Sequence, residues 1–228
     1  MPAAVVYYAF AFDGAPVDPG SRGWFAAPTV PHLLAVRART ALGRASGSQV
    51  MIYRCDGEIA HGSIRCEQAT LIHVGDATHE LRWFALYCAR SVANRWTPPH
   101  LVKEFLVAAD PELRDIAFQR ARAAFAVTED VSRMAARVTM YATADDDPAV
   151  CAREACKLAS RIASLDKSVQ LPQVKAQQER ALASTLLARA NARARTGEEP
   201  DFRLYGFESG DISDSALRDS SELPTAAA

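Results

Sequence analysis

The sequence predicts an α+β protein in which a small β-rich N-terminal domain packs on an antiparallel stack of about six α-helices, followed by an acidic C-terminal tail. Before residue 76, short segments rich in apolar and β-branched residues are typical of strands. From residue 76 onward the apolar residues recur with a period of about 3.6, as in amphipathic helices. The final segment is acidic and rich in serine, so it cannot build a core. We therefore expect three parts, residues 1–75, 76–197 and 198–228.

The first half of the N-terminal domain is predicted to hold one strand and one short helix. Residues 5–12 are almost all apolar and precede the turn residues of segment 13–20, so we expect a buried strand. Leucine and alanine recur at helical spacing in residues 31–44, which predicts a helix. Gly43 and Gly47 are expected to end it.

Two more strands are expected before residue 75. Residues 49–55 and 64–74 are rich in Val, Ile, Thr and Tyr, and an Asp-Gly pair after the first predicts a turn or bulge. Pairing of these strands would make Cys55 and Cys66 cross-strand neighbours that could form a disulfide. The preferred interpretation is that all five cysteines are reduced and mostly buried, because their number is odd and no CxxC spacing occurs.

Helix starts in the C-terminal part show a repeated pattern of a polar capping residue and a proline. The polar side chain accepts a backbone N–H bond, and the proline gives up an N–H that had no partner. With the apolar period, this pattern predicts helices that begin at Asp76 or Thr78, at Thr97, at Asp110, at about residues 129 and 147, and at Pro172. The fourth and fifth are expected to end at about residues 143 and 164, and the last near Arg195.

Aromatic and small residues on these helices are expected to form the core. Trp83, Phe84 and Tyr87 lie at helical spacing and are interpreted as core residues rather than a ligand-binding cage. Alanines at positions 121, 123, 124 and 126 and at positions 135 and 136 would let neighbouring helices approach closely. This favours an antiparallel stack.

The tail carries eight acidic and two basic residues, a net charge of −6 that leaves +5 for residues 1–197 of a chain whose total is −1. It contains an apolar island, whose predicted partner-binding residues are Phe202, Leu204, Tyr205 and Phe207. We interpret the island as a docking peptide for the chain's own body, for another subunit or for another partner. The alternative is a segment that only wraps back on the helical core.

Overall composition limits the classes of partner. The 26 basic and 27 acidic residues nearly cancel, which argues against nucleic acid or an anionic membrane as partner. The apolar N-terminus is about a dozen residues long, too short to cross a bilayer. No targeting signal is recognised, so a cytoplasmic location is expected, or a virion if the chain is encoded by a phage.

Several short motifs follow one another within residues 31–190. They are Gly57-Glu58-Ile59-Ala60-His61-Gly62, Cys88-Ala89, Trp96-Thr97-Pro98-Pro99, Ala109-Asp110-Pro111-Glu112-Leu113-Arg114, Gln177-Gln178-Glu179-Arg180-Ala181-Leu182 and Leu186-Leu187. In this order they resemble a family of uncharacterised bacterial and phage proteins. The resemblance implies a β-rich N-terminal domain before an Ala- and Arg-rich helical array, and it implies no activity. Two elements of the family differ here. The histidine of one is either lost or displaced by one position at His32, and the segment Cys66-Glu67-Gln68-Ala69-Thr70 stands where the family has a basic run.

Catalytic candidates are confined to the N-terminal domain. His61 follows Glu58 between glycines, where an imidazole and a carboxylate could act in acid–base catalysis, although a turn histidine bonded to the backbone is the preferred interpretation. Arg22, Ser46 and Glu58 could instead serve as in ADP-ribosyltransferase-like folds. No metal-binding spacing and no phosphate-binding loop occurs in the sequence, so no metal or cofactor is predicted.

These observations favour a non-catalytic protein-interaction or assembly protein, of phage or prophage origin, that acts through its helical surface and tail. Its expected partner is a second copy of itself or another assembly component. One alternative is a divergent ADP-ribosyltransferase-like enzyme that uses a nucleotide in the N-terminal domain. Another is binding of an anion or small molecule at the domain junction, where such sites are frequent.

Overall fold

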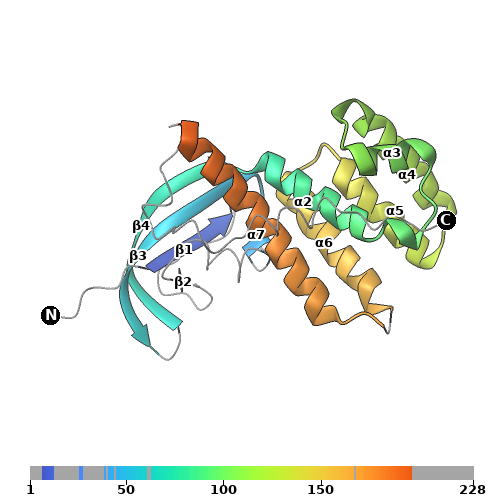
Figure 1. The fold of residues 1–228 in the computed structure, drawn as a ribbon. Helices are drawn as coiled ribbons and strands as arrows, with labels where there is room; N and C mark the ends of the chain where they lie inside the picture. The colour runs from blue at the N-terminus through green and yellow to red at the C-terminus, as the bar shows by residue number, and fades with distance from the viewer. Residues whose placement is uncertain are drawn as a thin grey trace.

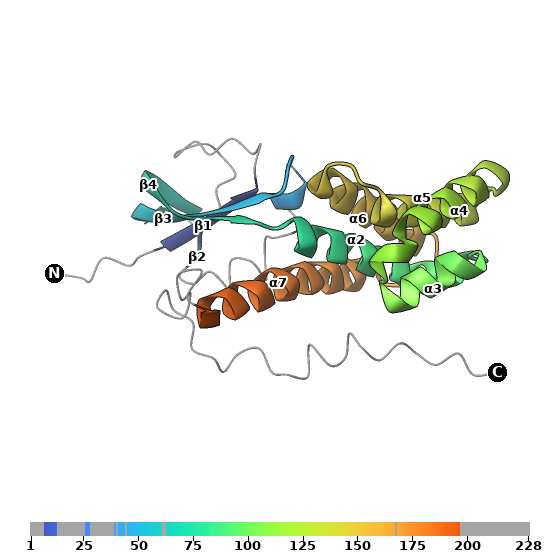
Figure 2. The same ribbon diagram turned by 90° about the horizontal axis from the view of Figure 1, so that it is seen from above.

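The computed structural model describes residues 7–12, 26–27, 39, 41–43, 45–60, 63–166 and 168–196. A four-stranded antiparallel sheet lies at one end of the molecule and six α-helices at the other, which confirms the predicted α+β class (Figure 1). The long last helix runs from the helical end back toward the sheet (Figures 1 and 2). None of the described helices has the length and apolar content needed to cross a membrane.

The sheet has the strand order β2-β1-β3-β4. Its strands are β1 (Tyr7–Phe12), β2 (Ala26–Ala27), β3 (Gln49–Ala60) and β4 (Ser63–Asp76). Strand β3 lies in the middle and pairs along its length with β4, so the two form a long hairpin. Near its start Val50 and Ile52 are buried while Met51 and Tyr53 are half-buried, which is the alternation expected of an antiparallel strand with one face on the core.

Strand β3 corrects two expectations about the N-terminal domain. The register shifts between Asp56 and Gly57, so the Asp-Gly pair is a bulge and the strand continues to Ala60 instead of ending at residue 55. Cys55 pairs with Ala69, and Cys66 pairs with Gly57. The two cysteines are therefore not a direct cross-strand pair, and the expectation that they face one another was wrong.

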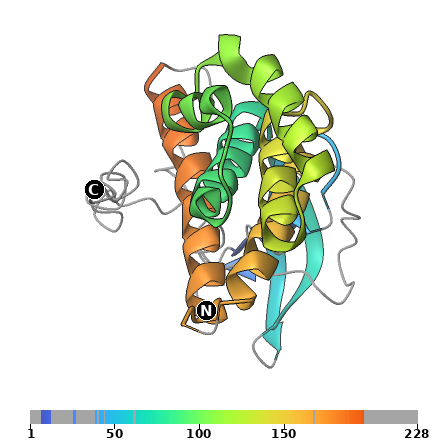
Figure 3. The same ribbon diagram turned by 90° about the vertical axis from the view of Figure 1, so that its right-hand side faces the viewer.

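The helices follow the sheet with short connections. They are α2 (Thr78–Ser91), α3 (His100–Ala108), α4 (Arg114–Val127), α5 (Asp130–Thr143), α6 (Pro148–Ser164) and α7 (Leu171–Thr196). Helix α2 is central, and it packs against α3, α5, α6 and α7 (Figure 3). Helices α4, α5 and α6 lie side by side in chain order.

The predicted capping residue ahead of a proline caps α6 but does not cap α3. Asp147 caps α6 as predicted, because its Oδ1 accepts hydrogen bonds from the N–H groups of Ala149 and Val150 at 2.9 and 3.1 Å. Thr97 does not cap α3, which begins three residues later at His100. Two consecutive prolines follow Thr97, and a residue that precedes proline is driven out of the helical region.

Small side chains dominate the contacts between helices. On α6 the buried residues include Ala149, Ala152, Ala155 and Ala159, which recur at three- or four-residue intervals along one face. Larger core residues fill the remaining space between helices. Phe84, for example, is 1% exposed. The predicted alanine packing is confirmed at positions 121, 135 and 136, whereas the alanines at positions 123 and 126 are exposed.

The residues just before β3 join the sheet to the helices. The N–H of Gly47 donates to Oδ2 of Asp147 at 2.7 Å, and Nη1 of Arg153 donates to the carbonyl of Ala45 at 2.9 Å. Beside them the N–H of Ala77, between β4 and α2, donates to the carbonyl of Ser48 at 2.8 Å. These bonds link both ends of the β3–β4 hairpin to the start of the helical array.

Candidate protein-interaction surface

Of the catalytic candidates in the N-terminal domain, the structure describes Ser46 and Glu58, and it places them far apart. Ser46 is exposed in the segment before β3, and Glu58 lies near the other end of that strand, opposite Arg65. Ten or more residues of extended chain separate them by on the order of 30 Å. Arg22 and His61 lie outside the described residues, as do the predicted docking residues Phe202, Leu204, Tyr205 and Phe207. The helical array therefore provides the surface on which a site can be built.

An aromatic and basic surface lies where α2 and α3 meet. Trp83 on α2 is 41% exposed, and Val107 near the end of α3 is 59% exposed. Arg90 lies between them, since its Cζ is 4.7 Å from the centroid of the Trp83 ring and its Nη2 donates to the carbonyl of Val107 at 3.0 Å. Together with Lys103, one helical turn before Val107, these residues form what we call the α2–α3 surface.

Helix periodicity explains why Trp83 faces outward. Positions 83, 87 and 90 lie along one side of α2, while Leu81, Phe84 and Cys88 point into the core. Only Phe84 of the three aromatic residues is fully buried; Tyr87 is half-buried, so the expectation that all three belong to the core was wrong for Trp83. Its separation by seven residues from Arg90 is the sequence signal that could have identified the pair.

Arg90 is held in place by the end of α3. The residue after that helix, Ala109, has a left-handed backbone with φ of 57°, and the last carbonyls of a helix have no partner within it. Arg90 donates to two of them, those of Leu106 and Val107. Because the guanidinium is fixed, its contact with the Trp83 ring helps to hold that ring in a defined position.

The charge of the surface is positive. Arg90 and Lys103 belong to it, and Arg180 of α7 lies close enough to Tyr87 to lower the pKa of that phenol, although burial has the larger effect and raises it. Trp, Tyr and Arg are the residue types that most often dominate binding energy at protein interfaces. A single exposed tryptophan is common on soluble proteins. An exposed tryptophan fixed over an arginine and flanked by further basic residues is suited to an acidic, apolar peptide.

Comparison with known protein families, curated proteins and solved structures finds no match for this chain. The family resemblance of the sequence motifs stays a prediction. The function is therefore inferred from the geometry of the described residues.

Proposed function

We propose that this chain is a non-catalytic interaction and assembly protein whose α2–α3 surface binds the acidic, aromatic tail segment of a second copy. The observation that carries the proposal is the exposed Trp83 ring held over Arg90, beside the exposed Val107. Such a surface is already formed before a partner arrives, which lowers the entropic cost of binding.

The C-terminal segment is the occupant that best fits this surface. It contains Phe202, Leu204, Tyr205 and Phe207 within a tail of net charge −6, whereas the rest of the chain carries +5. Aromatic side chains would pack against Trp83 and Val107, and the surrounding carboxylates would lie near Arg90 and Lys103. Complementary charge of this kind accelerates association and fixes the orientation of the bound peptide.

Chain length favours the tail of a second copy over the tail of the same molecule. Arg180 lies beside Tyr87, and α7 continues for 16 residues beyond it to Thr196, a distance of about 24 Å at 1.5 Å per residue. The six residues from Gly197 to Phe202 span at most about 20 Å when fully extended. Phe202 of the same chain would therefore fall short of Arg90, and only later residues such as Tyr205 and Phe207, which lie 9 and 11 residues beyond Thr196, could reach it at full extension. The whole segment, Phe202 included, can lie on the surface only when it comes from a neighbouring molecule.

The proposal is tested by measuring the mass of the assembly with size-exclusion chromatography and light scattering. We expect the full chain to form dimers or larger assemblies and the chain without residues 198–228 to be monomeric. Full-length and truncated proteins that are both monomeric would overturn the proposal. Assemblies of equal size with and without the tail would also overturn it.

A matched pair of substitutions locates the binding surface. Val107→Asp introduces a carboxylate that would repel the acidic tail, so we expect this variant to be monomeric. Val127→Asp makes the same change at a valine at the far end of α4 that is 82% exposed, and we expect it to assemble like the wild type. Equal assembly of the two variants would place the interface elsewhere.

A further inference from the structure

Two cysteines from distant parts of the sequence meet in a buried polar cluster. Cys88 on α2 is 0% exposed and Cys156 on α6 is 3% exposed, and the two thiols lie close enough for each to shift the pKa of the other. Nε of Arg39 donates to the same sulfur at 3.4 Å. The protonated thiol of Cys156 donates to Oε1 of Gln178 at 3.3 Å, and Ser160 donates to the same oxygen at 2.9 Å.

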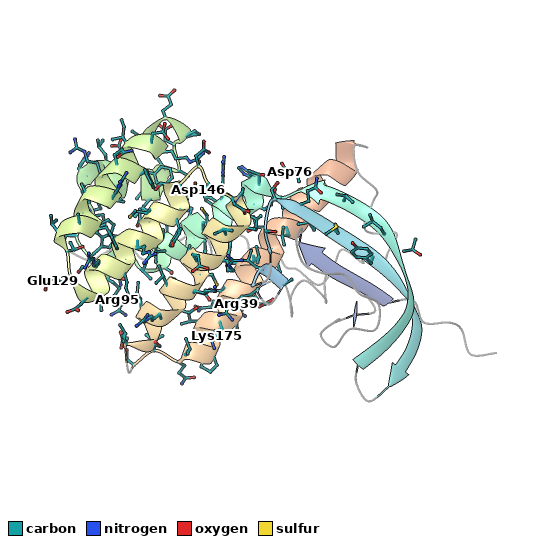
Figure 4. All side chains as sticks on the ribbon, turned by 180° about the vertical axis from the view of Figure 1, so that it is seen from behind. Arg39, Asp76, Arg95, Glu129, Asp146 and Lys175 are labelled. Carbon is teal, nitrogen blue, oxygen red and sulfur yellow. The ribbon has the colours of Figure 1, made fainter. Side chains whose placement is uncertain are left out.

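Arg39 reaches this cluster from the segment before β3. Its backbone N–H donates to Oε1 of Glu179 on α7 at 2.8 Å, and its guanidinium donates to the sulfur of Cys156 on α6. Arg39 is labelled in Figure 4. A buried cysteine in a core of alanines usually behaves as a small apolar residue. A guanidinium directed at one sulfur, and a second thiol directed at the same sulfur, are not needed for packing.

The surroundings shift the pKa values of the two thiols in opposite directions. The hydrogen bonds from Cys88 and Arg39 lower the pKa of Cys156 to about 7, against the opposing effects of burial and of the Glu179 carboxylate. Burial, and the bond to Cys156, hold the pKa of Cys88 well above its usual value. Cys156 is therefore the first of the two thiols to ionise, and it gives up its bond to Gln178 when it does. The thiolate is the reactive form of cysteine.

We propose that Cys156 and Cys88 are a thiol pair that a hydroperoxide converts to a reversible disulfide between α6 and α2. The Cys156 thiolate attacks the terminal oxygen of the peroxide, so that an S–O bond forms, the O–O bond breaks, and the alkoxide or hydroxide takes up a proton. Cys88 then attacks the sulfenic sulfur, so that an S–S bond forms and the hydroxyl leaves as water with the Cys88 proton. The two thiols lose two electrons, and the peroxide is reduced to an alcohol, or to water, with release of one further water.

Access to the sulfur favours a small oxidant. Arg39, which donates to the Cys156 sulfur, and Glu179, which accepts from Arg39, are half-buried, whereas the two thiols are buried. Hydrogen peroxide can pass where a bulky alkylating reagent cannot. Oxidation would also remove the sulfur charge that Arg39 faces, and Arg39 belongs to the segment that joins the helices to β3.

The test treats the full-length native chain with hydrogen peroxide and analyses it by mass spectrometry without reduction. We expect an intact mass lower by two hydrogen atoms, a cross-linked peptide that joins Cys88 to Cys156, and recovery of the original mass with a dithiol reductant. Both thiols staying reduced in the native chain, while the urea-unfolded chain oxidises under the same conditions, would overturn the proposal. A disulfide between other cysteines would overturn it as well.

Cysteine variants separate the roles of the two thiols. In Cys88→Ser, Cys156 is expected to stop at the sulfenic acid, which adds one oxygen to the intact mass and which dimedone traps when the oxidised protein is unfolded in its presence. The matched control is Cys151→Ser, because Cys151 is on the same helix but burial and the nearby Asp146 and Asp147 raise its pKa to about 11. That variant is expected to form the disulfide like the wild type. Loss of the disulfide in Cys151→Ser, or no trapped sulfenic acid in Cys88→Ser, would contradict the assignment.

The pH dependence of the reaction tests the part played by Arg39. Arg39→Gln removes the positive charge, so the midpoint of the rate against pH is expected to move upward and the rate at pH 7 to fall at least about tenfold, since less thiolate is present. Arg153→Gln, which also removes a contact to the segment before β3, is the control and is expected to leave the midpoint unchanged. An unchanged midpoint in Arg39→Gln would show that the guanidinium does not activate the sulfur.

Discussion

Arg90 connects two helices and supports the proposed binding surface through one side chain. Arg90→Ala would leave the carbonyls of Leu106 and Val107 without their partner and remove the cation beneath Trp83. We expect the free energy of unfolding, measured by urea denaturation, to fall by about 1–3 kcal/mol, as for loss of hydrogen bonds to a charged group.

A second arginine provides the comparison for this substitution. Arg137 lies over the Tyr141 ring at 5.7 Å, but it is exposed and its hydrogen bond is to a side chain within the same helix. Arg137→Ala is therefore expected to cost less than about 0.5 kcal/mol. Equal losses for the two variants would mean that the contact with α3 contributes nothing to stability.

Asp147 at the start of α6 both caps that helix and bonds to the segment before β3. Asp147 accepts bonds from two N–H groups of its own helix and, through its other oxygen, from Gly47. We expect Asp147→Ala to lower the free energy of unfolding by about 2 kcal/mol, because the cap and the bond to the segment before β3 are lost together. Asp146→Ala, at the exposed neighbouring position, is expected to change it by less than about 0.5 kcal/mol in the same denaturation experiment.

The helices were predictable where their signals are local. The fourth and fifth predicted helices agree within a residue with α5 and α6, and the last with α7, because capping residues and apolar periodicity act over a few positions. The length of β3 was not predictable in this way. The strand continues past its bulge at Gly57 because the residues on both sides of the bulge stay paired with β4.

The candidate sites depend on contacts that no local pattern encodes. Cys88 and Cys156 are 68 positions apart, and their meeting follows from the angle at which α2 packs on α6. The outward direction of Trp83 depends on which side of α2 is covered by α5, α6 and α7. The docking segment of the tail lies outside the described residues and stays a prediction, and the sequence did not indicate the surface on which we propose it binds.

At the scale of the whole molecule, the proposed assembly combines apolar anchors with opposite net charges. The tail carries −6 and the remaining chain +5, so electrostatic attraction adds to the packing of aromatic rings on Trp83 and Val107. The charge term is screened by salt, since the Debye length falls from about 10 Å at 0.1 M to about 3 Å at 1 M. The apolar term is not weakened in this way.

Ionic strength should therefore weaken the assembly without abolishing it. By sedimentation velocity, we expect the dissociation constant to rise about tenfold between 0.1 and 1 M sodium chloride, equivalent to about 1.4 kcal/mol of binding free energy. Replacing the tail carboxylates Glu198, Glu199, Asp201 and Glu208 with their amides should weaken the assembly at low salt and remove most of the salt dependence. Lys103→Gln should act in the same direction to a smaller extent, because it removes one charge from the surface. Tighter assembly of the wild-type chain at high salt would show that apolar contacts alone drive association, and that the charge of the tail has another role.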